Sequence, residues 1–223
     1  MNRRNHQSMI KQYYTVKKSG HLEIIIQKSK FIGYVERVNS EQEAVQFVQS
    51  IKKKHHDATH NCFAYIIGDH DQIQKANDDG EPAGTAGIPM LEVLRRLKLK
   101  NVAVVVTRYF GGIKLGAGGL IRAYSSVTSE TLNYIGIVKG ALMQGMALTI
   151  EYPLLGKVEN VVRKSPYIVD HIDYLDKVSL SVYVPINKVE SCKEELINLT
   201  NDQITIDHTD KKYIETDITP THE

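Results

Sequence analysis

The chain has 223 residues, of which 42% are hydrophobic and 24% charged, and its formal net charge is +2 at neutral pH. This length predicts two compact domains, because single domains usually hold about 100 to 150 residues. No run of roughly 20 apolar residues occurs, and the basic start of the chain lacks the apolar segment of a secretory signal, so we expect neither a membrane span nor export.

Charge is unevenly distributed along the chain. Residues 1–140 contain 20 Lys and Arg against 12 Asp and Glu, a net charge of +8, whereas residues 141–223 contain 8 against 14, a net charge of −6. This pattern is typical of a protein whose first half meets a polyanion such as RNA, although scattered solvated charge is the more common cause of such counts. The two cysteines, Cys62 and Cys192, offer no disulfide framework, which favours a cytoplasmic protein.

The first half predicts the element order ββαβ(β)αβα. The predicted elements are strands at 22–27 and 31–38, a helix after Ser40, a strand at 61–68, a helix behind Pro89, a strand at 102–106 and a helix over 120–131. Ser40 and Glu43 form a capping box. The unbroken apolar run at 102–106 indicates a central strand covered on both faces. Gly136 is placed to stop the last helix in the left-handed conformation.

The second half predicts the order βαββαβ, which is that of ferredoxin-like folds. Its elements are strands at 146–152, 167–174, 178–184 and 204–208, with helices at 154–164 and after Asn187. Asn187 and Glu190 are expected to cap the second helix. The acidic segment after Tyr213 has little apolar surface to bury and is expected to fray.

A polar segment, residues 68–87, is longer than most connections in a compact domain, and such segments usually fold against something or carry function. Asp78, Asp79 and Glu81 could chelate a hard cation, but their spacing is not that of a calcium loop, and turn chemistry accounts for the neighbouring glycines. We therefore expect no metal there. Thr85 or a nearby amide could cap the helix that starts at Pro89.

A glycine-rich segment, residues 108–119, joins the buried strand to the last helix of the first half. It exposes backbone N–H groups at the positive end of a helix, where Arg108, Lys114 and Arg122 add charge for a phosphate. The phosphate-binding loop motif is incomplete, because no Lys-Ser or Lys-Thr follows Gly116. The dinucleotide-binding motif is also incomplete, because its third glycine is missing. An anion site and a tight turn that lets the helix pack on the strand are equally good interpretations.

A third cluster contains His55, His56, Asp57, His60 and Cys62. His56 and His60 have the i, i+4 spacing of helical zinc ligands, but no glutamate follows His56 and no distal ligand is evident. A polar helix end is the favoured interpretation, and we expect no metal and no cofactor. Whether Cys62 could act as a nucleophile depends on geometry that the sequence does not contain.

Three blocks of the first half, residues 60–65, 78–87 and 108–124, resemble the YigZ/IMPACT family. The resemblance covers about residues 15–135, and the second half resembles the extra ferredoxin-like domain of the bacterial members. The implied class is α+β with two domains. The expected parts are an N-terminal extension at 1–14, a ribosomal protein S5 domain 2-like α/β sandwich at 15–140, a ferredoxin-like βαββαβ domain at 141–215 and a frayed tail at 216–223.

The resemblance implies a role close to translation, since the eukaryotic relatives regulate the translational stress response by binding a partner protein. Our first hypothesis is a binding protein whose basic first domain contacts RNA, the ribosome or a translation-related protein. The alternatives are a small enzyme acting on a phosphorylated substrate in a glycine-rich cleft, which we favour less, and a protein-binding module with an exposed apolar patch. The candidate binding residues are His60, Asp78, Asp79, Glu81, Thr85, Arg108, Tyr109, Gly111, Gly112, Lys114, Gly116, Gly119 and Arg122.

Overall fold

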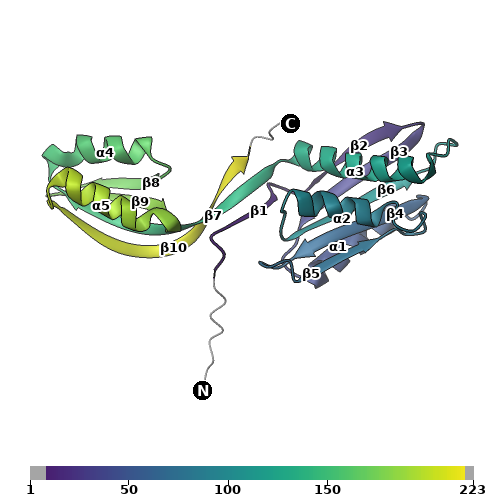
Figure 1. Ribbon diagram of the computed structural model, residues 1–223, viewed down its shortest axis with the longest axis horizontal. Coiled ribbons are helices and arrows are strands. Elements are labelled where there is room, and N and C mark those ends of the chain that lie inside the picture. The colour runs from purple at the N-terminus through teal and green to yellow at the C-terminus, as the bar shows by residue number, and fades with distance from the viewer. Residues whose placement is uncertain (1–8, 219–223) are drawn as a thin grey trace, which may run out of the picture. The chain divides into compact units, whose positions relative to one another are not determined.

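A computed structural model describes residues 9–218 of the chain (Figure 1). The elements are, in chain order, β1 (Gln12–Val16), β2 (Gly20–Ile26), β3 (Ser29–Arg37), α1 (Glu41–Lys54), β4 (His60–Ile67), β5 (Ile73–Asn77), α2 (Gly87–Arg96), β6 (Val102–Tyr109), α3 (Gly116–Ile135), β7 (Ile137–Ile150), α4 (Leu155–Lys164), β8 (Ile168–Tyr174), β9 (Val178–Pro185), α5 (Val189–Thr200) and β10 (Ile204–Ile218). Short 3-10 turns precede α4 and α5.

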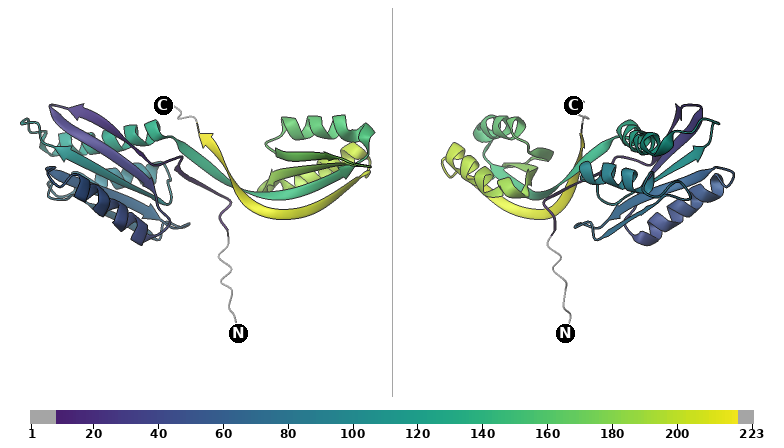
Figure 2. Two further views of the ribbon diagram at one scale, coloured as in Figure 1. Left: turned by 180° about the vertical axis from the view of Figure 1, so that it is seen from behind. Right: turned by 45° about the vertical axis from the view of Figure 1, so that its right-hand side comes forward.

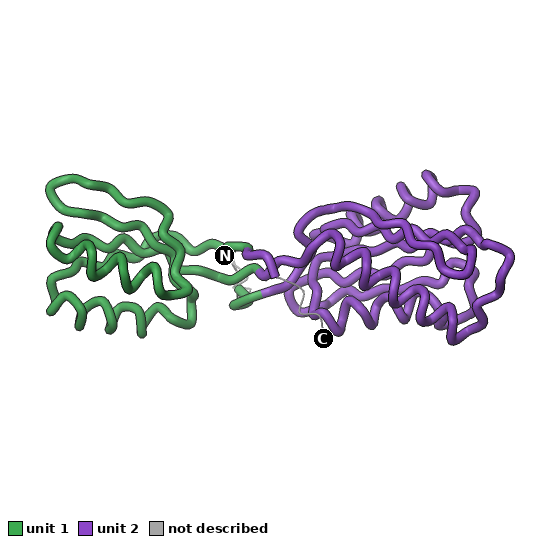
Figure 3. The backbone as a smooth tube through the Cα atoms, turned by 90° about the horizontal axis from the view of Figure 1, so that it is seen from above, with its two compact units in different colours: residues 1–12, 140–215 green, residues 13–139, 216–223 purple. Residues whose placement is uncertain are grey.

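The chain divides into two compact units (Figure 3). Among the described residues, the N-terminal unit contains residues 13–139 and 216–218, and the C-terminal unit contains residues 9–12 and 140–215. Each unit has its own buried apolar core. The α+β class with two sheets and two domains is thereby confirmed.

The N-terminal unit is built on an antiparallel sheet with the strand order β2-β3-β6-β4-β5. Strand β6 lies at its centre, where Val104 pairs with Val35 on one side and Ala64 on the other. Residues 102–108 are all buried. The prediction that an unbroken apolar run forms a central strand covered on both faces is confirmed, because water reaches neither side of β6.

Helices cover both faces of this sheet (Figure 2). Helices α2 and α3 pack on one face, where Met90, Leu94 and Tyr124 are fully buried in the main core. Helix α1 packs on the other face through Val48 and Ile51. Side chains of successive strand residues point to opposite faces, so the same strands supply both cores.

The helix ends of this unit only partly follow the predictions. Ser40 accepts a hydrogen bond from the Glu43 backbone N–H, so the predicted N-cap of α1 is confirmed. Gly136 ends α3 with a positive φ of 91°, but its ψ of 150° is extended and not left-handed helical as expected. Thr85 does not cap α2; its hydroxyl donates to the Pro82 carbonyl.

The polar segment 68–87 contains the short strand β5, which pairs with β4 at the edge of the sheet.

The C-terminal unit has the element order β7-α4-β8-β9-α5-β10, which confirms the predicted βαββαβ order. Its strands are ordered β7-β9-β8, and β10 also pairs with β7. Leu148, Leu180 and Ile172 are cross-strand neighbours, and α4 and α5 bury Val162 and Leu196 in the same core.

Three predictions near the chain ends and α5 need correction. Asn187 does not cap α5, because a 3-10 turn at Ile186–Lys188 precedes the helix and no side chain caps it. Strand β10 runs to Ile218, so residues 214–218 form strand where the segment after Tyr213 was expected to fray, while residues 219–223 lie outside the described residues. Strand β1 begins within the expected extension of residues 1–14, and residues 1–8 of that extension lie outside the described residues.

Among the described helices, no segment combines the length and the apolar character that a membrane span needs.

Candidate functional site

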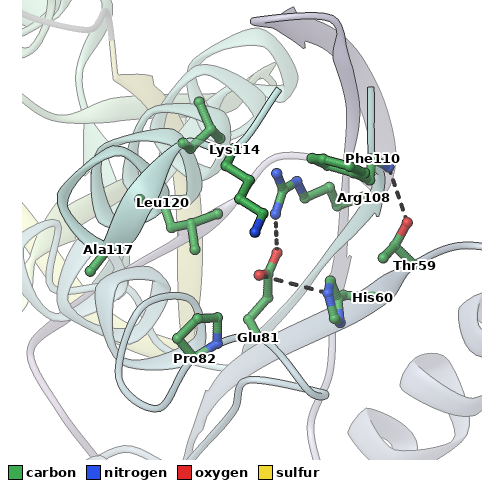
Figure 4. A pocket seen from close by; sticks show the side chains of 11 residues that line it. Thr59, His60, Glu81, Pro82, Arg108, Phe110, Lys114, Ala117 and Leu120 are labelled. Carbon is green, nitrogen blue, oxygen red and sulfur yellow. Dashed lines mark hydrogen bonds and ion pairs between the residues drawn. The ribbon is translucent and has the colours of Figure 1, made fainter. Parts of the chain in front are cut away.

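The N-terminal unit contains a pocket of about 280 Å³ at the end of the central strand β6 (Figure 4). It is lined by Thr59, His60, Glu81, Pro82, Arg108, Phe110, Lys114, Leu115, Gly116, Ala117 and Leu120. Three segments supply these side chains: the start of β4, the turn before α2, and the connection from β6 into α3. The strands are neighbours in the sheet, so segments that are distant in sequence meet at one edge.

An ion pair lies at the base of the pocket. The Arg108 guanidinium is 2.7 Å from Glu81 Oε1, and the two side chains are only 6% and 3% exposed. Arg108 also packs between the rings of Phe31 and Phe110, at 5.3 and 5.6 Å from the ring centres. A buried carboxylate needs such a partner, because burial of an unpaired charge costs several kcal/mol.

Further polar groups surround the Glu81 carboxylate. The Tyr124 hydroxyl donates to Oε1 at 2.8 Å, whereas Oε2 lies 3.7 Å from His60 Nε2. Behind Tyr124, the Cys62 thiol donates to the Asp78 carbonyl. Burial raises the pKa of Cys62 to about 12, which outweighs the lowering effect of the Tyr124 hydrogen bond. The thiol is therefore protonated at neutral pH and poorly suited to act as a nucleophile.

The connection from β6 to α3 forms the outer wall of the pocket. Phe110 is 46% exposed, and the Lys114 side chain points into the pocket toward the Glu81–Arg108 pair (Figure 4). Lys114 forms no ion pair with the residues described. Helix α3 starts at Gly116 without a side-chain cap and without an acidic residue in its first turn. Lys114 and the backbone N–H groups of α3 thus place positive charge on one side of the pocket.

Asp78 and Asp79 do not line the pocket but hold its turn in place. Asp78 Oδ1 accepts from the N–H groups of Ala86 and Gly87, and Oδ2 accepts from that of Gly84. Burial disfavours the charged carboxylate, but these three backbone donors outweigh that effect and hold the pKa of Asp78 below its ordinary value of 3.8. Asp78 supplies the helix cap that the sequence attributed to Thr85, because an acceptor eight or nine residues away reaches the first turn of α2.

Asp79 joins the same turn to the start of β4. Its Oδ2 accepts from the Asn61 backbone N–H at 2.6 Å, and its Oδ1 forms an ion pair with Lys52. Its carbonyl accepts from His60 Nδ1 at 2.8 Å. Asp79 therefore orients His60, although its own carboxylate faces α1 and not the pocket.

The structure brings together five of the candidate residues and separates the others. His60, Glu81, Arg108, Lys114 and Gly116 line the pocket. The candidates outside its lining are Asp78, Asp79, Thr85, Tyr109, Gly111, Gly112, Gly119 and Arg122. Of the three cations expected to add charge for a phosphate, Lys114 lines the pocket, Arg108 lines it as the buried partner of Glu81, and Arg122 does not line it. The candidate residues did not include Phe110 and Thr59. Phe110 lies inside the glycine-rich segment and Thr59 directly precedes His60, and these two positions were the available signal.

Gly111 has a packing role next to the pocket. A Cβ atom at this position would lie 1.9 Å from the Lys28 carbonyl oxygen in the β2–β3 turn. Its backbone N–H donates to the Ser29 hydroxyl at 3.2 Å, and Arg108 reaches the same hydroxyl at 3.4 Å. The close approach that only glycine allows brings the β2–β3 turn against the glycine-rich segment.

Tyr109 belongs to a separate cluster on the α1 side of the sheet. Its hydroxyl lies 2.9 Å from His55 Nδ1, while His55 Nε2 lies 2.7 Å from the Tyr34 hydroxyl. Burial and the charge of Lys54 lower the pKa of His55. His55 thus has a structural partner on each ring nitrogen. Within the described residues no group of three or more His, Cys, Asp or Glu could hold a metal ion.

A second cavity of about 460 Å³ lies between α2 and α3. Ile88 and Ile121 line it and are 50% and 41% exposed. Two exposed isoleucines form a small apolar surface, far less than the extended patch that marks a dedicated protein-binding module.

The comparisons with known proteins agree with the two-unit structure. Residues 27–132 match the family defined as the Impact N-terminal domain, and residues 148–203 match a domain of unknown function (DUF1949). The first match contains the whole pocket, and the second lies within the C-terminal unit.

Three relatives show similarity over most of the chain. The chain is 52% identical to IMPACT family member YvyE of Bacillus subtilis over 207 residues, covering 93% of this chain and 95% of the relative. It is 33% identical to IMPACT family member YigZ of Escherichia coli over 183 residues, covering 81% and 90%. A crystal structure of a hypothetical protein is similar with a TM-score of 0.57 and 30% identity, covering 89% of this chain and 97% of that one.

Proposed function

Since the chain belongs to the IMPACT family, we propose that it is a translation-associated binding protein whose N-terminal unit contacts RNA, either free or on the ribosome. The family resemblance supports the link to translation. The first 140 residues carry a net charge of +8, which supports a polyanionic partner.

The observation that carries this proposal is the placement of Phe110 and Lys114 at one pocket. The Phe110 ring is exposed, and Lys114 has no partner among the described charges. An accessible aromatic ring beside a cation is the usual means by which proteins bind single-stranded nucleic acid, because the base stacks on the ring and the phosphate meets the charge. Lys28 lies in the turn that packs on Gly111 and adds a cation next to the same segment.

The pocket gives less support to an enzyme. Its carboxylate, Glu81, is held in a buried ion pair, and the nearby Cys62 thiol has a raised pKa. A nucleophile needs a thiolate, which the Cys62 thiol does not supply, and a carboxylate paired with a guanidinium is a weakened base. A binding role requires only the charge and shape that the lining residues have.

The test is RNA binding at low and high salt. Fluorescence anisotropy with a labelled single-stranded RNA, together with cosedimentation with ribosomes, should show binding at low salt that weakens as salt rises, because phosphate contacts release counterions. We expect Phe110→Ala to weaken RNA binding by about tenfold, the size of one lost base–aromatic stack, and Lys114→Gln to reduce the salt dependence.

Matched control variants are available in the same unit. Tyr134 is 68% exposed at the other end of α3, and Lys98 is an exposed lysine outside the pocket. Tyr134→Ala and Lys98→Gln should leave RNA affinity within twofold of that of the unaltered protein. Absence of binding to RNA and to ribosomes at both salt concentrations would refute the proposed function.

A further inference from the structure

His60 Nε2 and Glu81 Oε2 face each other in the pocket, 3.7 Å apart, without a hydrogen bond between them. His60 Nδ1 lies 2.8 Å from the Asp79 carbonyl, which can only accept, so Nδ1 carries the proton of the neutral ring. In the neutral ring with this tautomer, His60 Nε2 is an acceptor that faces Glu81 Oε2. Glu81 Oε1 is engaged by Arg108 and Tyr124, whereas Oε2 makes no hydrogen bond with a described residue.

This arrangement points to a ligand that donates a hydrogen bond. Glu81 is 7% exposed and its free oxygen faces the pocket (Figure 4). A carboxylate oxygen at a pocket wall can accept a strong hydrogen bond from a ligand, because hydrogen bonds to charged groups are among the strongest that a protein makes. A hydroxyl group placed beside Glu81 Oε2 and His60 Nε2 would supply that donor.

The outer wall of the pocket, formed by the connection from β6 to α3, suits an anion. Lys114 points into the pocket, and Gly116 and Ala117 line it at the uncapped start of α3. Gly116 is the first residue of a 20-residue helix, and the first four N–H groups of a helix have no intrahelical acceptor. A phosphate placed there would accept hydrogen bonds from these groups and pair with Lys114.

The size of the pocket and its apolar wall limit the ligand further. A volume of about 280 Å³ lies just below the range of small-molecule sites and suits one nucleotide unit better than a duplex. Phe110, Leu115 and Leu120 provide apolar surface in the lining of the pocket. A ligand that joins a phosphate, a hydroxyl donor and a flat ring matches all three features.

We propose that the pocket binds one ribonucleotide of single-stranded RNA and reads its 2′-hydroxyl. The phosphate lies at Lys114 and the start of α3, the base stacks on Phe110, and the 2′-hydroxyl donates to Glu81 Oε2 or His60 Nε2. This inference rests on the proposed function and adds a selection for RNA over DNA, because DNA lacks the donor.

The decisive experiment compares three labelled oligonucleotides of one sequence with the full chain: RNA, DNA and 2′-O-methyl RNA. The methylated strand keeps the sugar oxygen but cannot donate. We expect RNA to bind about tenfold or more tightly than both others, which is the size of one lost hydrogen bond to a charged acceptor. Equal affinity for all three would overturn the inference and leave RNA binding intact, whereas binding to none would overturn the proposed function.

A His60 variant and a mononucleotide test whether the preference for RNA arises in this pocket. His60→Phe keeps a ring but removes the acceptor, so the preference for RNA over 2′-O-methyl RNA should fall while binding of DNA is retained; an unchanged preference would refute the role of this acceptor. In amide spectra, adenosine 5′-monophosphate should shift the signals of Gly116 and Ala117 more than 2′-deoxyadenosine 5′-monophosphate does. Equal shifts with inorganic phosphate alone would indicate a simple anion site and contradict the inference.

Discussion

Arg108 and Glu81 form a buried ion pair of 2.7 Å between the central strand β6 and the turn that precedes α2. The two residues are 27 positions apart in the sequence. Their pairing joins two of the three segments that form the pocket. Arg108 Nε is buried without a partner, so the guanidinium depends on Glu81 and Ser29 for its hydrogen bonds.

Removal of one partner of this pair should strongly destabilise the protein. We expect Glu81→Gln or Arg108→Met to lower the free energy of unfolding by about 3–5 kcal/mol, because each leaves a buried group without its counter-charge. The double variant should lose less than the sum of the two single losses. Urea denaturation of all four proteins measures this coupling, and strictly additive losses would show that the two charges do not depend on each other.

The Asp78 cap predicts a pH-dependent contribution to stability. The pKa of this carboxyl in the folded protein lies below its ordinary value of 3.8, so its contribution is fully present above about that pH and is lost as the pH falls through the lowered folded-state pKa. Asp78→Asn should cost about 1–3 kcal/mol at neutral pH, the size of a lost buried hydrogen bond. Denaturation curves measured from pH 7 to pH 3 should show the difference between the two proteins shrinking; a constant difference would contradict this role.

Gly111 should not tolerate a side chain. In Gly111→Ala the added Cβ would lie 1.9 Å from the Lys28 carbonyl, so we expect a loss of about 1–3 kcal/mol as the β2–β3 turn moves away. Gly118→Ala is the matched control, because only the end of the Arg122 side chain approaches its Cβ, at 3.6 Å, and alanine favours the helix. Thermal melts should give a lower melting temperature for Gly111→Ala than for Gly118→Ala. Equal melting temperatures of the two variants would exclude close packing at Gly111.

Both thiols should resist chemical labelling in the folded protein. Cys62 and Cys192 are buried, and burial raises the pKa of each, that of Cys62 to about 12. The thiolate is the reactive form, so at pH 8 a thiol reagent should label neither residue until denaturant exposes both. Mass spectrometry of labelled peptides reports each thiol separately. Rapid labelling of Cys62 under native conditions would show that the core around Tyr124 opens.

The sequence predicted most elements of secondary structure because the information lies in short segments. The hydrophobic spacing after Ser40, the apolar run at 102–106 and the alternating strands of the second half each depend on neighbours a few residues away. Predictions were wrong where another local structure formed in place of the expected motif. At Asn187, for example, a 3-10 turn precedes α5 in place of the predicted cap. Errors also occurred in β10, where pairing with β7 orders a polar segment that has little apolar surface of its own.

The sequence by itself determined the family, the class of fold and the segments from which the pocket is made, since each of these is recorded in local residue patterns. Only the tertiary structure decided which side chains of those segments face one another. It assigned Arg108 to a buried pair with Glu81, Asp78 to a helix cap and Tyr109 to another face of the sheet. Such assignments depend on strand order and on the alternation of side chains across β6, which bring together residues that no local pattern connects.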